Sequence, residues 1–260
     1  MKNFLYREVI FIDDLSFKEY LMKNNIDVCK EYFKRERVTS DSDIIEQIKI
    51  ANEVHEILRN YNNDGSFRVN STIGKKIEST KLKVKRLERD IKIRTNKEEK
   101  NEVDKIILSK GTSILNQAIL AINQAFKSDY LNLIKRSMVR KELCLGKIDG
   151  SNLKKDQSIK LGTIKGITYN LVEEDIYNYL RKIRKQRQEI RIDNIINQYI
   201  KVSNLTVQSQ KYIDSLLLIP SDSIKYWLKY IENKRKISLN EHFVNIKEAF
   251  DFESNDYGRS

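Results

Sequence analysis

Turn-forming residues and cysteines are scarce in this chain of 260 residues. It contains 1 proline and 8 glycines, and this scarcity disfavours a fold of many short strands and favours long helices. The 2 cysteines, Cys29 and Cys144, lie far apart in the sequence, which argues against a disulfide framework. The 2 histidines, His55 and His242, are too few for a histidine-based metal site, and we expect both to be ordinary helix residues.

Long apolar runs are missing as well. No uncharged apolar run reaches the length that spans a bilayer, and the first residues, MKNFLYREVIFIDDLSF, lack the basic-then-apolar pattern of an export signal. The composition, with 40% hydrophobic and 33% charged residues, is that of a globular protein and not of a disordered one. We therefore expect a soluble protein that folds in a reducing cytoplasm.

Positive charge is abundant and is concentrated in one segment. The formal net charge is +12, and the stretch Lys75–Lys97 holds ten basic residues against three acidic ones. Such a segment can bind anions, and the candidate residues for this are Lys75, Lys76, Lys83, Arg86 and Arg89. The commoner alternative is a solvated helix whose lysine stems cover apolar surface.

The spacing of hydrophobic residues predicts a mainly α protein with a small β component. Helix-start residues at 39–42 are followed at helical spacing by Ile44, Ile48, Ala51, Val54 and Leu58. Further helices are predicted over residues 17–22, 75–97, 113–125, 130–140, 175–187, 192–202, 208–218 and 221–234. Extended or strand-like stretches are predicted at residues 7–12, 31–38, 66–72, 144–150 and 158–167.

The stretch CLGKIDGSNL, residues 144–153, has the spacing of a phosphotransferase catalytic loop. Kinases place an aspartate that orients the nucleophile five residues before an asparagine that helps to hold magnesium, and further acids follow. Gly146 and Asn152 match this spacing, whereas Leu145 and Lys147 stand in the histidine and aspartate positions. Thr163 and Lys165 occupy the positions of the two later acids.

The segments around this loop resemble the C-terminal half of the CotS-type spore coat proteins. These are kinase-like relatives of aminoglycoside phosphotransferases and choline kinases. Cys144 matches the leading cysteine of their loop, and Tyr169–Val172 leads to Asp175 in the family's order. The resemblance covers roughly residues 110–235 and implies a degenerate member, in which Gly146 and Asp175 keep structural roles as a turn and a tether of the loop.

The resemblance also implies a kinase-like C-lobe preceded by a truncated or rebuilt N-terminal lobe. About 70 residues precede the basic helix, and they contain no glycine-rich loop. The implied division is a reduced N-terminal lobe at 1–74, a basic connector at 75–110, a helical C-lobe at 111–252 and a tail at 253–260.

The residues at the loop disfavour phosphotransfer. An ammonium group at position 147 cannot act as a carboxylate base, and a threonine at 163 is a poor ligand for magnesium. We therefore expect no metal, no cofactor and a non-catalytic, pseudokinase-like protein. Its partners would be other proteins, and it would lie in the cytoplasm or the spore coat.

Two alternatives remain open at this point. The first is a basic protein that binds nucleic acid or another anion through the segment that starts at Lys75. The second, less favoured, is an active small-molecule phosphotransferase with relocated acids, for which Asp149, Glu173 and Glu174 are candidates.

Overall fold

The structure, a computed structural model, describes residues 16–34, 40–62, 67–186, 190–232 and 237–256. These residues belong to two compact units, each assembled from two separate stretches of chain. The first unit contains Met1–Ile73 and Tyr130–Ile213, and the second contains Gly74–Asp129 and Asp214–Ser260. Most described residues are helical, as the sequence predicts; the strand predicted at 7–12 lies outside the described residues.

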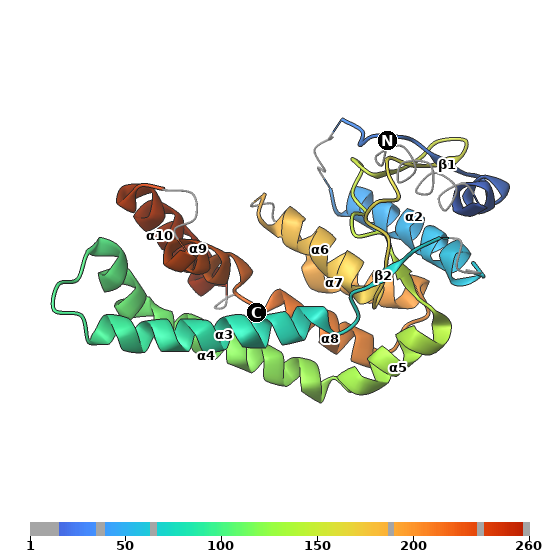
Figure 1. Ribbon diagram of the computed structural model, residues 1–260. Helices are drawn as coiled ribbons and strands as arrows, with labels where there is room; N and C mark the ends of the chain where they lie inside the picture. The colour runs from blue at the N-terminus through green and yellow to red at the C-terminus, as the bar shows by residue number, and fades with distance from the viewer. Residues whose placement is uncertain (1–15, 35–39, 63–66, 187–189, 233–236, 257–260) are drawn as a thin grey trace, which may run out of the picture. The chain divides into compact units, whose positions relative to one another are not determined.

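The first unit contains two small sheets, and the two strands labelled in Figure 1, β1 and β2, belong to different ones. In one sheet β5 lies between β1, which is parallel to it, and β4, which is antiparallel. In the other, β6 lies between the parallel β2 and the antiparallel β3. The strands are β1 (Ile26–Val28), β2 (Asn70–Ser71), β3 (Leu143–Cys144), β4 (Leu153–Lys155), β5 (Ile159–Leu161) and β6 (Thr168–Tyr169). Strands β3 and β6 belong to one sheet, and β4 and β5 belong to the other. The connections 145–152 and 162–167 therefore both run between the two sheets, and this brings them close together.

The other regular elements described in the first unit are helices, and α2 packs against β3 and β4. The first unit contains α2 (Asp41–Arg59), α5 (Tyr130–Arg140), α6 (Glu173–Arg184), α7 (Ile192–Val202) and most of α8 (Val207–Leu217), after a short helix at 16–23. At the start of α2, Ser40 and Asp43 form a reciprocal capping box. The five apolar residues predicted to share one face of this helix are all buried. Strand β1 was not predicted, and residues 31–34 of the predicted extended stretch lie in no strand.

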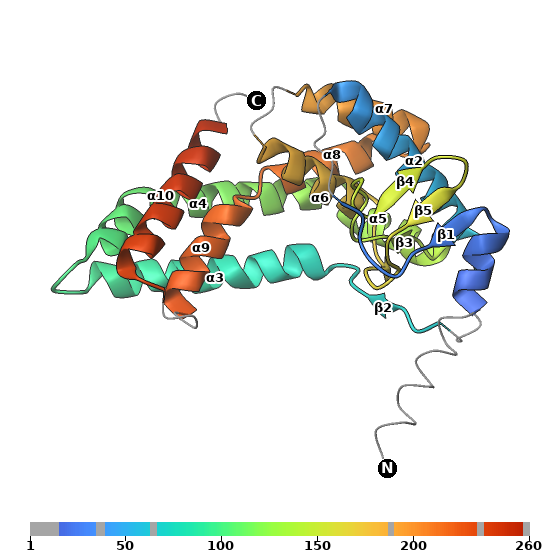
Figure 2. The same ribbon diagram turned by 90° about the horizontal axis from the view of Figure 1, so that it is seen from above.

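The second unit is a bundle of four helices (Figure 2). Helix α3 packs against α4 and α9, and α10 also packs against both of these helices. The helices are α3 (Lys75–Thr95), α4 (Glu102–Lys127), α9 (Ser221–Glu232) and α10 (Leu239–Asp256). Helix α4 begins 11 residues before the predicted start at 113, and α10 was not predicted. The start of α4 is fixed by a second capping box, formed by Asn101 and Asp104.

The centre of the bundle is formed around Trp227 of α9. Its indole packs edge-on against Phe250 of α10, with 6.0 Å between ring centroids. On α4, a Cβ at Gly111 would lie 2.8 Å from this indole, so the glycine leaves room for the Trp227 ring against α4. The two compact units are not the lobes that the sequence predicts, and they do not test that division. The predicted lobes therefore stay a prediction.

Candidate functional site

The loop at 145–152 is held by Asp175, which lies in the first turn of α6. Its Oδ2 accepts a hydrogen bond from the Leu145 amide at 2.7 Å, and its Oδ1 accepts one from the Gly146 amide at 2.8 Å. Asp175 is buried, so these two bonds satisfy a carboxylate that water cannot reach. This is the geometry of a tether between the loop and the helix.

Helix α2 contributes two polar side chains around the same loop, one bound to Asp175 and one bound to the loop itself, and the sequence did not point to either contact. The His55 Nε2 lies 2.9 Å from the Asp175 Oδ2. The Gln47 Nε2 donates to the Ile148 carbonyl at 2.6 Å and to the Leu153 carbonyl at 2.9 Å. A histidine beside the predicted apolar stripe of α2 was the one available signal for this contact.

Four of the predicted motif positions, Lys147, Asn152, Thr163 and Lys165, belong to one hydrogen-bonded cluster. The Asn152 Nδ2 donates to the Lys147 carbonyl at 2.9 Å, and the Asn152 Oδ1 accepts from the Thr163 amide at 2.9 Å. The Thr163 Oγ1 in turn accepts from the Lys165 amide at 3.2 Å. The buried Asn152 therefore joins the loop after β3 to the turn after β5, where the two kinase motifs are expected to meet.

The charge in this cluster is positive. The Lys147 Nζ lies 3.8 Å from the centroid of the Tyr32 ring, within the range of a cation–π contact, and Lys165 is exposed. Magnesium prefers carboxylate oxygens, and these two side chains carry ammonium groups instead. Across the described ranges, no group of three or more His, Cys, Asp or Glu side chains is placed to hold a metal ion. The residues present do not fit the magnesium site of a phosphotransferase.

Asp149, the nearest candidate for a relocated acid, is already paired. Its Oδ1 accepts from the Ser151 amide at 3.0 Å and from the Ser151 hydroxyl, and its Oδ2 accepts from the Lys182 ammonium group. Burial raises the pKa of Asp149, but the hydrogen bonds from Lys182 and Ser151 outweigh it and hold the pKa below its usual value. This carboxylate links the loop to α6.

Glu173 and Glu174, the other two candidates, are buried in polar networks. Glu173 forms a two-point ion pair with Arg136 of α5 at 2.7 and 2.8 Å. Glu174 accepts from Asn170 at 2.8 Å and from the Tyr212 hydroxyl at 3.2 Å. Burial raises the pKa of Glu173, and the contacts with Arg136 more than reverse this effect. Both carboxylates serve the packing of α5, α6 and α8.

A segment from the N-terminal part of the chain, residues 29–33, covers the turn after β5. The Cys29 amide donates to the Leu161 carbonyl at 2.6 Å, and the Phe33 amide donates to the Ser151 carbonyl at 2.8 Å. A Cβ at Gly162 would lie 2.9 Å from the Glu31 carbonyl oxygen, so backbone packs directly on backbone here. We call residues 29–33 the covering segment.

The predicted anion-binding residues lie on α3, in the second unit. Lys75, Lys83 and Arg89 are exposed, and Lys76 is half-buried. Arg86 forms an ion pair with Glu232 of α9 at 2.7 Å. All five thus lie at least partly in solvent along one helix, and Arg86 also helps to join two helices.

Of three comparisons with known proteins, the one with solved structures supports this fold. No family model matches the chain, and a search of curated proteins finds no match. Among solved structures, the chain is similar to an aminoglycoside phosphotransferase from Alicyclobacillus acidocaldarius subsp. acidocaldarius DSM 446, with a TM-score of 0.69 and 11% sequence identity. The match covers 95% of this chain and 81% of that one. Similarity at this level of identity describes the fold alone. The chain therefore has a kinase-like fold of the aminoglycoside phosphotransferase type, mainly helical with small sheets.

Proposed function

We propose that this chain is a non-catalytic, kinase-like protein with a binding or structural role. The observation that carries the proposal is the hydrogen-bonded cluster around Asn152, which includes Lys147, Thr163 and Lys165. By the motif spacing, these three residues stand at the positions of a phosphotransferase's carboxylates. An ammonium group cannot accept the proton of a substrate hydroxyl, and it repels magnesium. Because positioning and electrostatic stabilisation supply most of the rate of phosphoryl transfer, the loss of these acids removes the basis of the reaction.

The covering segment supports the same proposal. Its backbone packs on Gly162, next to the amide of Asn152. A phosphate that approached this turn would meet the Glu31 carbonyl oxygen and the backbone of Tyr32. The segment therefore adds a steric obstacle to the electrostatic one.

The experiment that tests the proposal is a thermal unfolding series with ATP and magnesium. A ligand present at 100 times its Kd stabilises a folded protein by about 2.7 kcal/mol, which is readily detected as a change in Tm. We expect the Tm to be the same with ATP and magnesium as with buffer alone. A rise in Tm that requires both ATP and magnesium would contradict the proposal.

A repair variant, which restores carboxylates at the motif positions, tests which change in the protein removed the binding of ATP and magnesium. Lys147→Asp combined with Thr163→Asp would place carboxylates at two of the motif positions, and Lys154→Asp combined with Thr163→Ser is the control. If only the repair variant gains a magnesium-dependent rise in Tm with ATP, the two substitutions account for the loss of binding. If it does not, the N-terminal lobe, which we propose to be truncated or rebuilt, is the deeper defect.

We also propose a role linked to sporulation, as a component or binding partner of the spore coat. Support for this part comes from the resemblance over residues 110–235, in which Cys144 and Tyr169–Val172 follow the order of the CotS-type proteins. Immunodetection in coat extracts of purified spores tests it. Absence from such extracts would remove the spore role and leave the non-catalytic role standing.

A further inference from the structure

Two large aliphatic side chains stand in solvent on α3. Leu82 is 68% exposed and Ile93 is 63% exposed, although Ile77, Val84 and Leu87 of the same helix are buried. They are 11 residues apart, so they lie close to one line along the helix and about 16 Å from each other. Arg89 lies on the same line, because it is separated from them by 7 and 4 residues.

Basic side chains lie on and beside this line. Lys83, Lys85, Arg89 and Lys92 are all exposed, and none of them forms an ion pair with another residue that the structure describes. Of the three acids of α3, Glu88 lies four residues before Lys92 but forms no ion pair among the residues that the structure describes, and the other two pair elsewhere. Glu78 pairs with Lys81 at 2.9 Å, and Asp90 is buried in contact with Arg94. We call this face, comprising Leu82, Lys83, Lys85, Arg89, Lys92 and Ile93, the α3 outer face.

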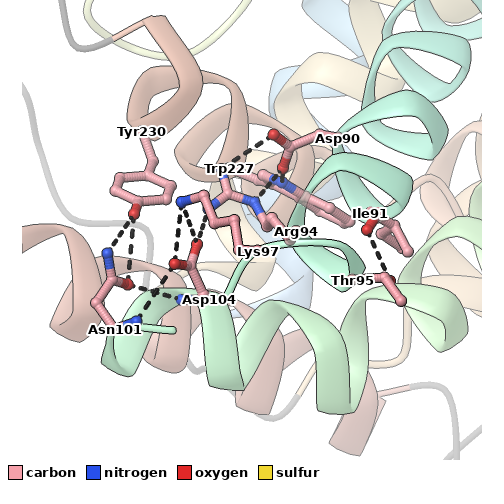
Figure 3. A network of polar contacts seen from close by, with 9 residues as sticks. All are labelled: Asp90, Ile91, Arg94, Thr95, Lys97, Asn101, Asp104, Trp227 and Tyr230. Carbon is pink, nitrogen blue, oxygen red and sulfur yellow. Dashed lines mark hydrogen bonds and ion pairs between the residues drawn. The ribbon is translucent and has the colours of Figure 1, made fainter. Parts of the chain in front are cut away.

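Helix α3 is held firmly behind this face (Figure 3). Asp90 accepts hydrogen bonds from Arg94 and from the Trp227 indole at 2.6 Å, and Arg94 also donates to Asp104 of α4. The Arg94 guanidinium stacks over the ring of Tyr230, 4.6 Å from its centroid. The α3 outer face therefore belongs to a helix whose position is fixed by contacts with α4 and α9.

From this geometry we infer that the α3 outer face is a docking surface for an acidic amphipathic helix of a partner protein. Two apolar anchors about three turns apart on a straight helix match the apolar ridge of a second helix. The flanking cations require carboxylates on the partner, which fixes the sign of its charge. Nucleic acid is the less fitting occupant, because its phosphates would meet the cations and leave both aliphatic side chains in water.

This inference deepens the proposed function by giving the binding role a surface and a class of partner. It rests on the second unit alone and uses no residue of the catalytic-loop cluster. An active phosphotransferase could still carry this surface, and a non-catalytic protein could lack it. The two proposals therefore fail separately.

The test uses the full chain and a fluorescent 22-residue peptide with a helical, acidic sequence. Leucines at positions 4, 8, 11 and 15 form its apolar ridge, and glutamates flank the ridge. Binding is followed by fluorescence anisotropy, and a peptide of the same composition in scrambled order serves as the peptide control. A single-stranded oligonucleotide of matched charge is the competing probe.

Two pairs of substitutions separate apolar docking from attraction between charges. Leu82→Ser with Ile93→Ser keeps every charge, and we expect it to weaken binding of the peptide at least about tenfold, because both anchors are lost. The control is Leu239→Ser with Val244→Ser on α10, which are 45% and 44% exposed in the same unit, and it should leave binding unchanged. Lys85→Glu with Lys92→Glu should weaken binding of both the peptide and the oligonucleotide.

Several results would overturn the inference. These are equal binding of the scrambled peptide, no loss of binding in the Leu82→Ser, Ile93→Ser variant, or oligonucleotide binding as tight as that of the acidic helix. Circular dichroism melts of each variant confirm that the fold is retained. If the double serine variant unfolds, the milder pair Leu82→Ala with Ile93→Ala carries the same expectation.

Discussion

At the scale of single residues, the loop at 145–152 depends on a glycine in the left-handed region. Gly146 has φ +72°, and a Cβ at this position would lie 2.8 Å from the Gly166 carbonyl oxygen. Gly150, four residues later in the same loop, has no atom within 4 Å of the place where its Cβ would be. The two glycines therefore form a matched pair for a test of the loop.

We expect Gly146→Ala to lower the free energy of unfolding by about 1–3 kcal/mol, through backbone strain and the contact with Gly166. Gly150→Ala should change it by less than about 1 kcal/mol, because only the entropy of the unfolded chain is altered. Urea unfolding followed by circular dichroism measures both. Equal effects in the two variants would show that the loop does not adopt this conformation.

Asp175 provides a second test at this scale. Asp175→Ala removes the acceptor of the Leu145 and Gly146 amides and leaves His55 without its partner. We expect a loss of about 2–5 kcal/mol in the free energy of unfolding, because buried donors lose their bonds. The control Asp193→Ala, at an exposed position in the first turn of α7, should cost less than about 1 kcal/mol. A loss of similar size in both variants would contradict the tether.

The sequence identified some of these residues and missed others for a physical reason. Asn152 and Asp175 were found because motif spacing is local and can be read along the chain. His55, Gln47 and Tyr32 were not, because each meets the loop or Asp175 from a segment about 100 residues or more away. Such partners depend on which strands pair, and short strands such as β1 leave a weak signal.

At the scale of elements, the bundle of the second unit is joined by buried charge. Arg94 of α3 is 5% exposed and Asp104 of α4 is fully buried, and they are joined by a direct hydrogen bond. Burial raises the pKa of Asp104, but hydrogen bonds from Lys97 and Arg94 outweigh it and bring the pKa below its usual value. The pairing of α3 with α4 is therefore linked to pH.

The direction of this dependence follows from the lowered pKa. The stabilisation is fully present above the unfolded pKa of about 3.9 and is lost as the pH falls through the lower folded value. Arg94→Met leaves Asp90 and Asp104 short of a partner, so we expect a loss of about 3–5 kcal/mol at pH 7. The difference from the wild type should shrink as the pH falls below about 4, because the wild type then loses the stabilisation that comes from the paired Asp104 carboxylate.

Unfolding of the wild type and of the Arg94→Met variant in urea is measured by the fluorescence of Trp227, the one tryptophan of the chain. Lys105→Met is the control. The ion pair of Lys105 with Glu102 is exposed on α4, the helix that carries Asp104, and it contributes about 0–1 kcal/mol. A difference between Arg94→Met and the wild type that stays constant with pH would contradict the role of the buried carboxylates.

Helices with a clear apolar stripe were predicted best. The bounds of α5 and α7 agree with the prediction, and α2 starts at the predicted cap. The first turns of α4 were missed although the Asn101–Asp104 capping box is visible in the sequence, because charged residues interrupt the apolar pattern there. Helix α10 was missed for a similar reason, since its acidic residues are interleaved with the apolar ones that pack on α4 and α9.

At the scale of the whole molecule, the chain passes between the two units three times, after Ile73, Asp129 and Ile213. Each unit has its own core and its own polar network. Local changes in one unit should therefore loosen that unit first.

Hydrogen exchange on the intact chain tests this independence. Arg94→Met should speed amide exchange in α3, α4, α9 and α10 and leave α6 and α7 protected. Asp175→Ala should give the opposite pattern. Mass spectrometry of peptic fragments measures both, and a uniform increase across the chain in either variant would show that the two units unfold as one.

The interleaving of the two units also matters during protein synthesis. The ribosome completes α3 and α4 by Lys127, but α9 begins only at Ser221. At about 5–20 residues per second, this helical hairpin waits roughly 5–20 s for the helices that complete its core. Over that interval the side of α3 and α4 that finally meets Trp227 is open to chaperones, and nascent chains stalled between these two points should be their preferred clients.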